Sequence, residues 1–279
     1  MTTITQAVEA LVQTTVDLPD EEMGRPWTWK EYDEEGLRFA LLMAQHELRD
    51  LAVRLTVMAP VSQAQRILAQ YHEAYRDLTG ALAGVHDEDL DVPPAAQEWP
   101  VRAVIEHMLG ADYGFLAVVQ YARWPERPRD PEASDEEWPR FRDRLGYRAP
   151  AELRGGIAGV RNALFEIHRR VLRELWDLRD DELEEPAEFW DGTKPIRFRL
   201  HRFEAHYVQH TIQVDKTLEA ISRGPTEARR LVRVLYRDLA PVEMLARAGV
   251  GEEECALVAS IIRDRAGEIA ALIDTVPHV

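Results

Sequence analysis

Cysteine is almost absent from this sequence, since Cys255 is the only one in 279 residues. A disulfide within the chain and a zinc site built from several cysteines are therefore excluded. A single thiol suits a reducing compartment. The first residues, Met1 to Ala7, lack the basic start and the long apolar run of a secretory signal peptide. Together these absences predict a cytoplasmic protein.

Long apolar runs and clusters of basic residues are also scarce. The most prominent apolar run, Phe39 to Ala44, is far shorter than the roughly 20 residues of a membrane-spanning helix. Lys and Arg number 34 against 50 Asp and Glu, which gives a formal net charge of −16. Phosphate backbones and anionic membrane surfaces both need clustered cations. We therefore expect neither nucleic acid nor a membrane as a partner, and we interpret the acidic excess as solvation.

Helical periodicity is what the sequence does contain. Apolar residues recur every three or four positions along most of the chain, and Pro and Gly separate the segments. No stretch alternates for long enough to predict a sheet. The pattern predicts helices over 4–15, 34–56, 62–82, 100–123, 150–180, 199–222, 226–239, 241–248 and 252–273. The predicted fold class is therefore all-α, a helical bundle with additional helices at both ends.

The connection from Trp124 to Pro150 is rich in proline and charge, which predicts a solvated surface loop. A lid over a pocket is the alternative for this segment. The N-terminal part contributes three aromatic residues outside the predicted bundle, Trp27, Trp29 and Tyr32. Core filling is the favoured role for them, ahead of a dimer contact or a pocket wall.

Two histidines stand one helical turn apart, His206 and His210. At 100° per residue they are about 40° apart around a helix, and Gln213 lies on the same face. Two histidines with this spacing can hold one metal ion, as in zinc proteases. The residue after His206 is Tyr207, so the H-E-x-x-H motif and its general base are missing.

A third ligand has to come from a facing helix, and His107 is the best candidate. Gly and Ala follow it unusually closely, at Gly110, Ala111 and Gly114. Because Gly lowers helix stability, these residues indicate close helix packing, open space beside the imidazole, or both. On spacing alone, two interpretations of these three histidines are equally good. They form a metal site, or they are ordinary half-buried histidines that bond to backbone or carboxylate groups.

Three sequence segments, considered together and in their order along the chain, give further evidence on the histidines. They are the helix and turn over 67–90, the segment Glu98 to His107 (EWPVRAVIEH), and the segment Ala205 to Val214 (AHYVQHTIQV). In order and separation they resemble motifs of the DinB/YfiT-like superfamily of metal-binding four-helix bundles. The resemblance covers residues from about 61 to 222. Where that family has His-Arg-Gly-Gln, this chain has Thr211 and Ile212 between the histidine and the glutamine.

The resemblance implies that His107, His206 and His210 bind one divalent metal ion, with water in the remaining positions. Imidazole ligands leave Zn, Ni, Fe and Mn all open as the metal. The resemblance also implies a metal-dependent enzyme that acts on a small molecule. A transferase that uses a low-molecular-weight thiol as cofactor is favoured. A metal-dependent hydrolase and a non-catalytic metal-binding or stress-response protein are the alternatives.

The resemblance further divides the chain into an N-terminal helical extension (1–60), a DinB-like four-helix bundle (61–223) and a C-terminal helical extension (224–279). The sequence leaves open whether the protein forms a homodimer.

No general base can be identified from the sequence. Glu106 and Asp112 lie about 100° and 140° around the helix from His107, so neither is expected to face the metal. Tyr71 and Tyr75 are favoured as core residues over pocket residues. Arg202 could bind a substrate carboxylate or be a surface residue. Cys255 is expected to be a buried helix residue and not a nucleophile.

Overall fold

Helices make up most of the structure, a computed structural model that describes residues 3–25, 36–146, 153–189 and 192–274. The helices are α1 (Thr3–Thr15), α2 (Gly36–Thr56), α3 (Gln63–Ala81), α4 (Val101–Arg123), α5 (Pro131–Leu145), α6 (Ile157–Leu175), α7 (Ile196–Ala220), α8 (Glu227–Arg247) and α9 (Glu252–Asp274). Strands within the described ranges are limited to one antiparallel hairpin, β1 (Pro186–Phe189) with β2 (Gly192–Pro195). The predicted all-α fold class is confirmed.

The chain divides into two compact units. The first, here called the terminal unit, comprises residues 1–61, 72–85 and 222–279, and the second, the central unit, comprises 62–71 and 86–221. Helix α3 therefore contributes its first residues to the central unit and the others to the terminal unit. The three-part division at residues 60 and 223 stays a prediction.

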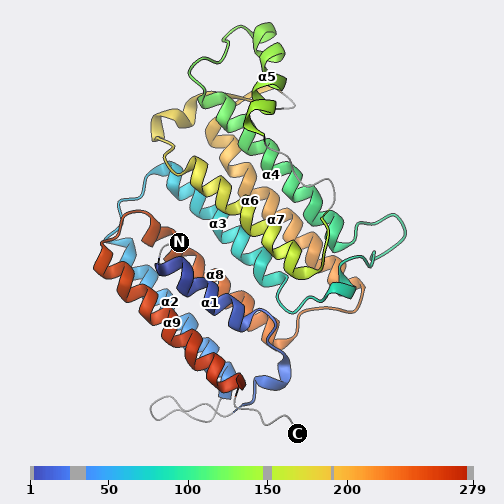
Figure 1. Cartoon of the computed structure of the whole chain (residues 1–279), viewed down its shortest axis with the longest axis vertical. Helices are drawn as coiled ribbons and strands as arrows, with labels where there is room; N and C mark the ends of the chain where they lie inside the picture. Colours follow the sequence, from blue (N-terminus) through green and yellow to red (C-terminus); the bar gives the residue numbers. More distant parts are fainter. Residues whose placement is uncertain (1–2, 26–35, 147–152, 190–191, 275–279) are drawn as a thin grey trace. The chain divides into compact units, whose positions relative to one another are not determined.

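The terminal unit is built from paired helices. Helix α1 packs against α9, and α2 packs against α8, with further contacts between α2 and α9 and between α1 and α8. Figure 1 shows these four helices side by side. One apolar stripe from each helix is buried, for example Ala7, Val8 and Leu11 of α1. The core of this unit is thus formed by both ends of the chain.

Helix α8 carries most of the polar contacts to the second part of α3. Glu243 accepts hydrogen bonds from Arg76 (2.7 and 2.6 Å) and lies 2.9 Å from Nε2 of His72. Burial opposes ionisation of Glu243, but the charge of Arg76 and these hydrogen bonds hold its pKa at about 2. The pair is nearly buried, so removal of one partner would leave an uncompensated charge.

The central unit holds α4, α6 and α7 together with the first residues of α3 (Figure 1). Helix α4 contacts both α7 and α6. Tyr71, the last α3 residue of this unit, lies against Phe203 and Tyr207 of α7, with ring centroids 5.1 Å away in each case. These helices correspond to the predicted bundle.

Three local predictions are wrong. The segment predicted as a surface loop contains α5. Pro131 occupies the first turn of this helix, where its missing N–H costs no hydrogen bond. Asp130 is the N-cap, and its Oδ2 accepts a hydrogen bond from the backbone N–H of Ala133 at 2.9 Å. The hairpin was not predicted, since strands of four residues are too short to show alternation. Helix α8 continues through Pro241 instead of breaking, with buried residues on both sides.

Several predicted features fall outside the described residues. They are the aromatic residues Trp27, Trp29 and Tyr32, and the helix start at Pro150. Helix α6 begins at Ile157 and ends at Leu175, which shortens the predicted helix at both ends.

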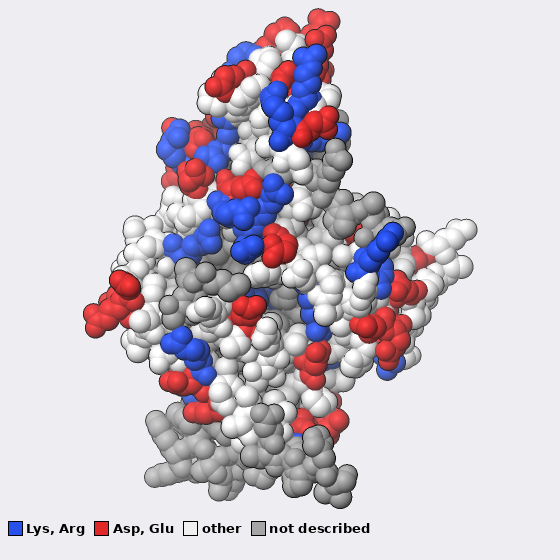
Figure 2. Space-filling view, in the orientation of Figure 1, with Lys and Arg blue, Asp and Glu red and all other residues white. Residues whose placement is uncertain are grey.

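Charges of opposite sign are interspersed on the surface. Around α5, at the top of Figure 2, basic and acidic side chains lie next to each other, and Glu137 pairs there with Arg140 and Arg144. Within the described ranges, no helix is both long enough and apolar enough to cross a membrane.

One close approach in the terminal unit gives a test of this packing. A Cβ atom on Gly80 would lie 2.8 Å from the Cα atom of Arg233 in α8, so an added methyl group forces the helices apart. We expect Gly80→Ala to lower the free energy of unfolding by about 1 to 3 kcal/mol. Urea unfolding followed by far-UV circular dichroism measures this change.

The matched control is Gly114→Ala in α4, where a Cβ atom would meet nothing within 4 Å. This change is expected to stabilise the protein by about 0.5 to 1 kcal/mol, because Ala favours the helix over Gly. Equal effects of the two substitutions would contradict the close packing of α3 and α8.

Candidate metal centre

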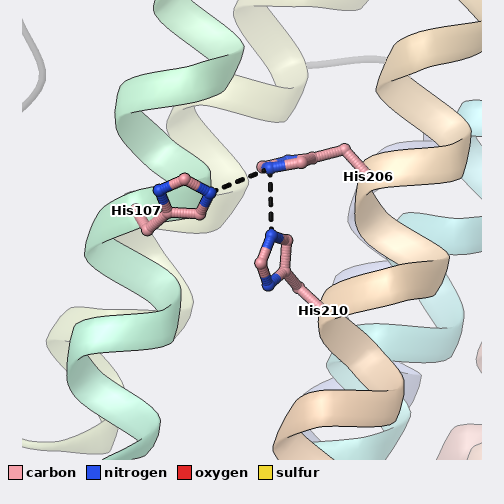
Figure 3. A group of neighbouring side chains, drawn as sticks. All are labelled: His107, His206 and His210. Atoms are coloured by element: carbon pink, nitrogen blue, oxygen red, sulfur yellow. Dashed lines mark hydrogen bonds between the residues drawn. The ribbon is translucent and has the colours of Figure 1, made fainter. Parts of the chain in front are cut away.

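Three histidine side chains converge between α4 and α7. His107 projects from α4, and His206 and His210 project from α7 (Figure 3). The Nε2 atom of His206 lies 3.2 Å from that of His107 and 3.0 Å from that of His210. His206 and His210 are buried, whereas His107 is exposed. The structure thus brings together the three residues predicted as ligands, while their binding of a metal stays a prediction.

Arg102, which belongs to the segment Glu98 to His107, holds the start of α4 in place. Pro100 is the N-cap of the helix, and Arg102 lies in its first turn. The guanidinium group of Arg102 donates to both oxygens of Asp91 (2.6 and 2.9 Å) and to the carbonyl oxygens of Leu153 and Gly155 (2.7 and 2.8 Å). Arg102 therefore ties the loop before α4 and the segment before α6 to the helix that carries His107.

A buried carboxylate sets the register between α4 and α7. Asp112 accepts hydrogen bonds at Oδ2 from the hydroxyl groups of Tyr207 (2.8 Å) and Tyr71 (3.0 Å). All three side chains are fully buried. Tyr207 directly follows His206, and Asp112 lies five residues after His107. The hydrogen bond between the two helices therefore fixes which turn of α7 faces His107.

The separations between the imidazole nitrogens fit a shared ion. Two nitrogens that each lie about 2.1 Å from one ion are about 3.0 to 3.4 Å apart at angles between tetrahedral and octahedral values. The two measured Nε2 separations, 3.0 and 3.2 Å, lie in this range. The candidate ligand atoms of all three residues lie within 4.8 Å of one another.

Hydrogen bonding alone does not account for the cluster. A ring nitrogen carries either one hydrogen or one lone pair, yet Nε2 of His206 faces two other nitrogens. The other ring nitrogen of His206, Nδ1, is buried without a hydrogen-bond partner among the described residues, and an ion at Nε2 would not change this. A cation facing three lone pairs satisfies all three Nε2 atoms at once.

The orientation of His210 is set by Gln213. Its Nδ1 lies 2.8 Å from Oε1 of Gln213 in the next turn of α7 and can donate to it. With the hydrogen on Nδ1, the lone pair of Nε2 points into the cluster, which is the tautomer that a metal requires. Gln213 was placed on the face of the histidine pair by the helical spacing, and its contact with His210 confirms that position.

Burial keeps the two α7 histidines neutral. It is the main cause that lowers the pKa of His206 to about 3, and the neighbouring His210, His107 and Arg202 lower it further. The pKa of His210 is lowered mainly by burial too, against the opposing hydrogen bond to Gln213. Metal ligation requires the neutral imidazole, so both residues are in the binding form at neutral pH.

Gly110 and Gly114 follow His107 on α4. A Cβ atom on Gly110 or Gly114 would meet nothing within 4 Å. Close helix packing is therefore wrong at these two exposed positions, and open space beside the imidazole stays a prediction.

The acids near His107 are engaged elsewhere. Glu106 accepts a hydrogen bond from the backbone N–H of Leu153 at 2.7 Å, and Asp112 belongs to the buried network with the tyrosines. As predicted, Tyr71 and Tyr75 are core residues, with relative exposures of 0 % and 3 %.

The structure also places two other candidate residues, while the role of Arg202 stays a prediction. Arg202 stacks over Phe115 at 6.0 Å, and Phe115 contacts His206, so Arg202 lies on the metal-site side of α7. Cys255 lies in α9 of the terminal unit and is half-buried, so the prediction of a buried residue is wrong, because the start of α9 is partly exposed. Partial burial raises the pKa of its thiol, which argues against a nucleophile.

A pocket of about 650 Å³ adjoins the histidines. Its lining includes Trp99, whose ring centroid is 5.3 Å from that of His107, and Gln213, the partner of His210. Lys216, one turn beyond Ile212 and two turns beyond Gln209 on α7, also lines it. No motif in the sequence pointed to Lys216, although its position, three residues after Gln213, is close to the site.

The buried carboxylate gives a pH-dependent prediction. Burial raises the pKa of Asp112 to about 7, from its ordinary value of 3.8, while the tyrosine hydrogen bonds oppose this rise. Between about pH 4 and 7 the folded chain therefore binds one more proton here than the unfolded chain. Stability from this group is present at low pH and falls by about 1.4 kcal/mol per unit as pH rises through that window.

Asp112→Asn removes this titration and keeps the shape of the side chain. The stability of the variant relative to wild type should rise with pH between 4 and 7 and level off above 7. Urea unfolding at several pH values, with a chelator present, measures the difference. A difference that stays constant with pH would contradict a raised pKa at Asp112.

The contact between Gln213 and His210 predicts an effect on metal affinity. Gln213→Leu removes the acceptor for Nδ1 of His210, and we expect zinc affinity to fall by about 10- to 100-fold. Competition with a chromophoric chelator measures the affinity. Gln209→Leu on the same helix is the control, because among the described residues Gln209 makes no hydrogen bond to a histidine, and it should leave affinity within about twofold.

A family model matches the part of the chain that holds the histidines. The model of the DinB superfamily matches residues 70–214, a little more than half of the chain, and all three histidines lie in the matched part. No curated protein and no solved structure matches the chain. With its helical fold and its converging histidines, the chain belongs to the DinB superfamily.

Proposed function

We propose that the protein is a metal-dependent enzyme whose site is formed by His107, His206 and His210, and that it is a thiol-cofactor-dependent transferase acting on small molecules. The observation that carries this proposal is the convergence of three Nε2 atoms, with separations of 3.0 and 3.2 Å around His206. Zn, Ni, Fe and Mn are all compatible with three imidazole ligands.

The residues of the chain have separable roles in this proposal. His107, His206 and His210 would hold the ion, and Gln213 would orient His210. A bound divalent ion would lower the pKa of a coordinated thiol or water and polarise a carbonyl group. Because three neutral ligands leave the charge of the ion uncompensated, the site would favour an anionic thiolate as a further ligand.

The surroundings of the site support a thiol cofactor over water as the nucleophile. Glu106 and Asp112, the acids nearest to His107 in sequence on α4, are held by Leu153 and by the tyrosines. A thiol is a much stronger acid than water and loses its proton on coordination without a base. The pocket beside Trp99 gives a small molecule access to the same place.

Hydrolysis is the second candidate, and one observation favours it. Glu98 lines the pocket next to Trp99 and is exposed. It is the one acid among the described residues that line this pocket. A carboxylate there could act as a general base for water.

Cobalt substitution tests the proposal. Chelator-treated protein reloaded with Co²⁺ should bind one ion per chain, and titration with bacillithiol, mycothiol or glutathione should add a thiolate-to-cobalt absorption band for at least one of them. His206→Ala should lose both the ion and the band. His201→Ala, an exposed residue on the same helix, is the control and should retain both.

Each alternative has its own outcome in this experiment. If Co²⁺ binds and no thiol changes the spectrum, while ester hydrolysis is lost in Glu98→Gln, the protein is a hydrolase. If Co²⁺ binds and neither activity is found, it is a non-catalytic metal-binding protein. If Co²⁺ binds wild type and His206→Ala equally, the proposed metal site is wrong.

A further inference from the structure

The pocket beside the histidines combines two features that select a ligand, an exposed aromatic face and a cation. Its volume is about 650 Å³, large enough for a small organic molecule. The pocket lies entirely within the central unit. Its chemistry can therefore be considered apart from the terminal unit.

Apolar surface is left exposed in this pocket. Trp99 is 45 % exposed and Ile212 is 56 % exposed, and both line it. A tryptophan that keeps half of its surface in solvent offers a flat face for stacking. Because the Trp99 ring also lies 5.3 Å from that of His107, a body stacked here would lie close to the metal site.

The backbone before α4 adds an independent sign of a constrained site. Gln97 has a φ of 69°, in the left-handed region that glutamine rarely adopts. It lines the same pocket, two residues before Trp99. Unfavourable backbone conformations cluster at ligand sites, where the surrounding structure maintains them.

The charge in the pocket is unusual for this chain. Only three of the 34 basic residues are lysines, and Lys216 is one of them. In the part of the chain that the structure describes, no salt bridge is formed by Lys216. Arg202, a second cation, stacks over Phe115 beside His206. Among the described residues that line the pocket, Lys216 is the one base and Glu98 the one acid.

We propose that this pocket binds a small organic carboxylate with a flat apolar body, which stacks on Trp99 while its carboxylate pairs with Lys216. The claim that this molecule is the substrate rests on the proposed function. The binding itself depends on Trp99 and Lys216 and needs no metal ion. The pocket thereby determines which class of molecule binds beside the three histidines.

Calorimetry with a matched pair of probes tests the pocket. 2-Naphthoate carries the flat body and the carboxylate, and 2-naphthamide carries the same body without charge. We expect chelator-treated wild-type protein to bind the carboxylate at least about threefold more tightly than the amide. Lys216→Met should abolish this preference, and Trp99→Leu should weaken both probes about two- to tenfold. Lys194→Met, a lysine of β2 outside the pocket, is the control and should change neither.

The outcomes separate the pocket from the metal site. Failure of both probes to bind, or a carboxylate preference that survives Lys216→Met, would overturn the pocket proposal whether or not a metal binds. The same titrations on zinc-treated protein show whether the ion adds affinity. If the carboxylate preference depends on Lys216 but no zinc is bound, the pocket stands and the proposed metal-dependent function fails.

Discussion

The hydrogen bond from Tyr207 to the buried carboxylate of Asp112 is the contact on which the site depends. It joins α4 and α7 inside the central unit, and Tyr71 of α3 donates to the same oxygen. A shift of one turn would leave this carboxylate buried without its partners, which is costly. The same register places His206 opposite His107. The geometry of the histidine cluster is thus maintained by a polar contact of the core that includes none of the proposed ligands.

The electrostatics of the site differ from those of the whole chain. The net charge is −16, yet the groups that act on His206 and His210 are other imidazoles and Arg202. Much of the acid is instead paired on the surface, as Glu137 is with Arg140 and Arg144. Solvation by acidic side chains and a cluster of neutral histidines coexist because exposed charges are screened over about 10 Å.

The local predictions failed where short elements depend on their surroundings. Proline at 131 and 241 looks like a helix breaker in sequence, but the first lies at the start of α5 and the second lies within α8, between buried residues. The hairpin before α7 has strands of four residues, whose alternation cannot be distinguished from chance. Long helices were predicted well because apolar periodicity accumulates over many turns.

The sequence by itself determined the all-α class and the pairing of His206 and His210 on one face. Local periodicity carries this information, because residues three or four apart share a helix face whatever the tertiary structure. The choice of His107 as their partner rested on the small residues that follow it and on the resemblance of its segment to the DinB/YfiT-like motifs. Only the tertiary structure decided that the three Nε2 atoms meet, that Gly110 and Gly114 border open space, and that Trp99 and Lys216 line one pocket. These facts depend on contacts between segments about a hundred residues apart, and such contacts are set by packing of the core, which no local pattern records.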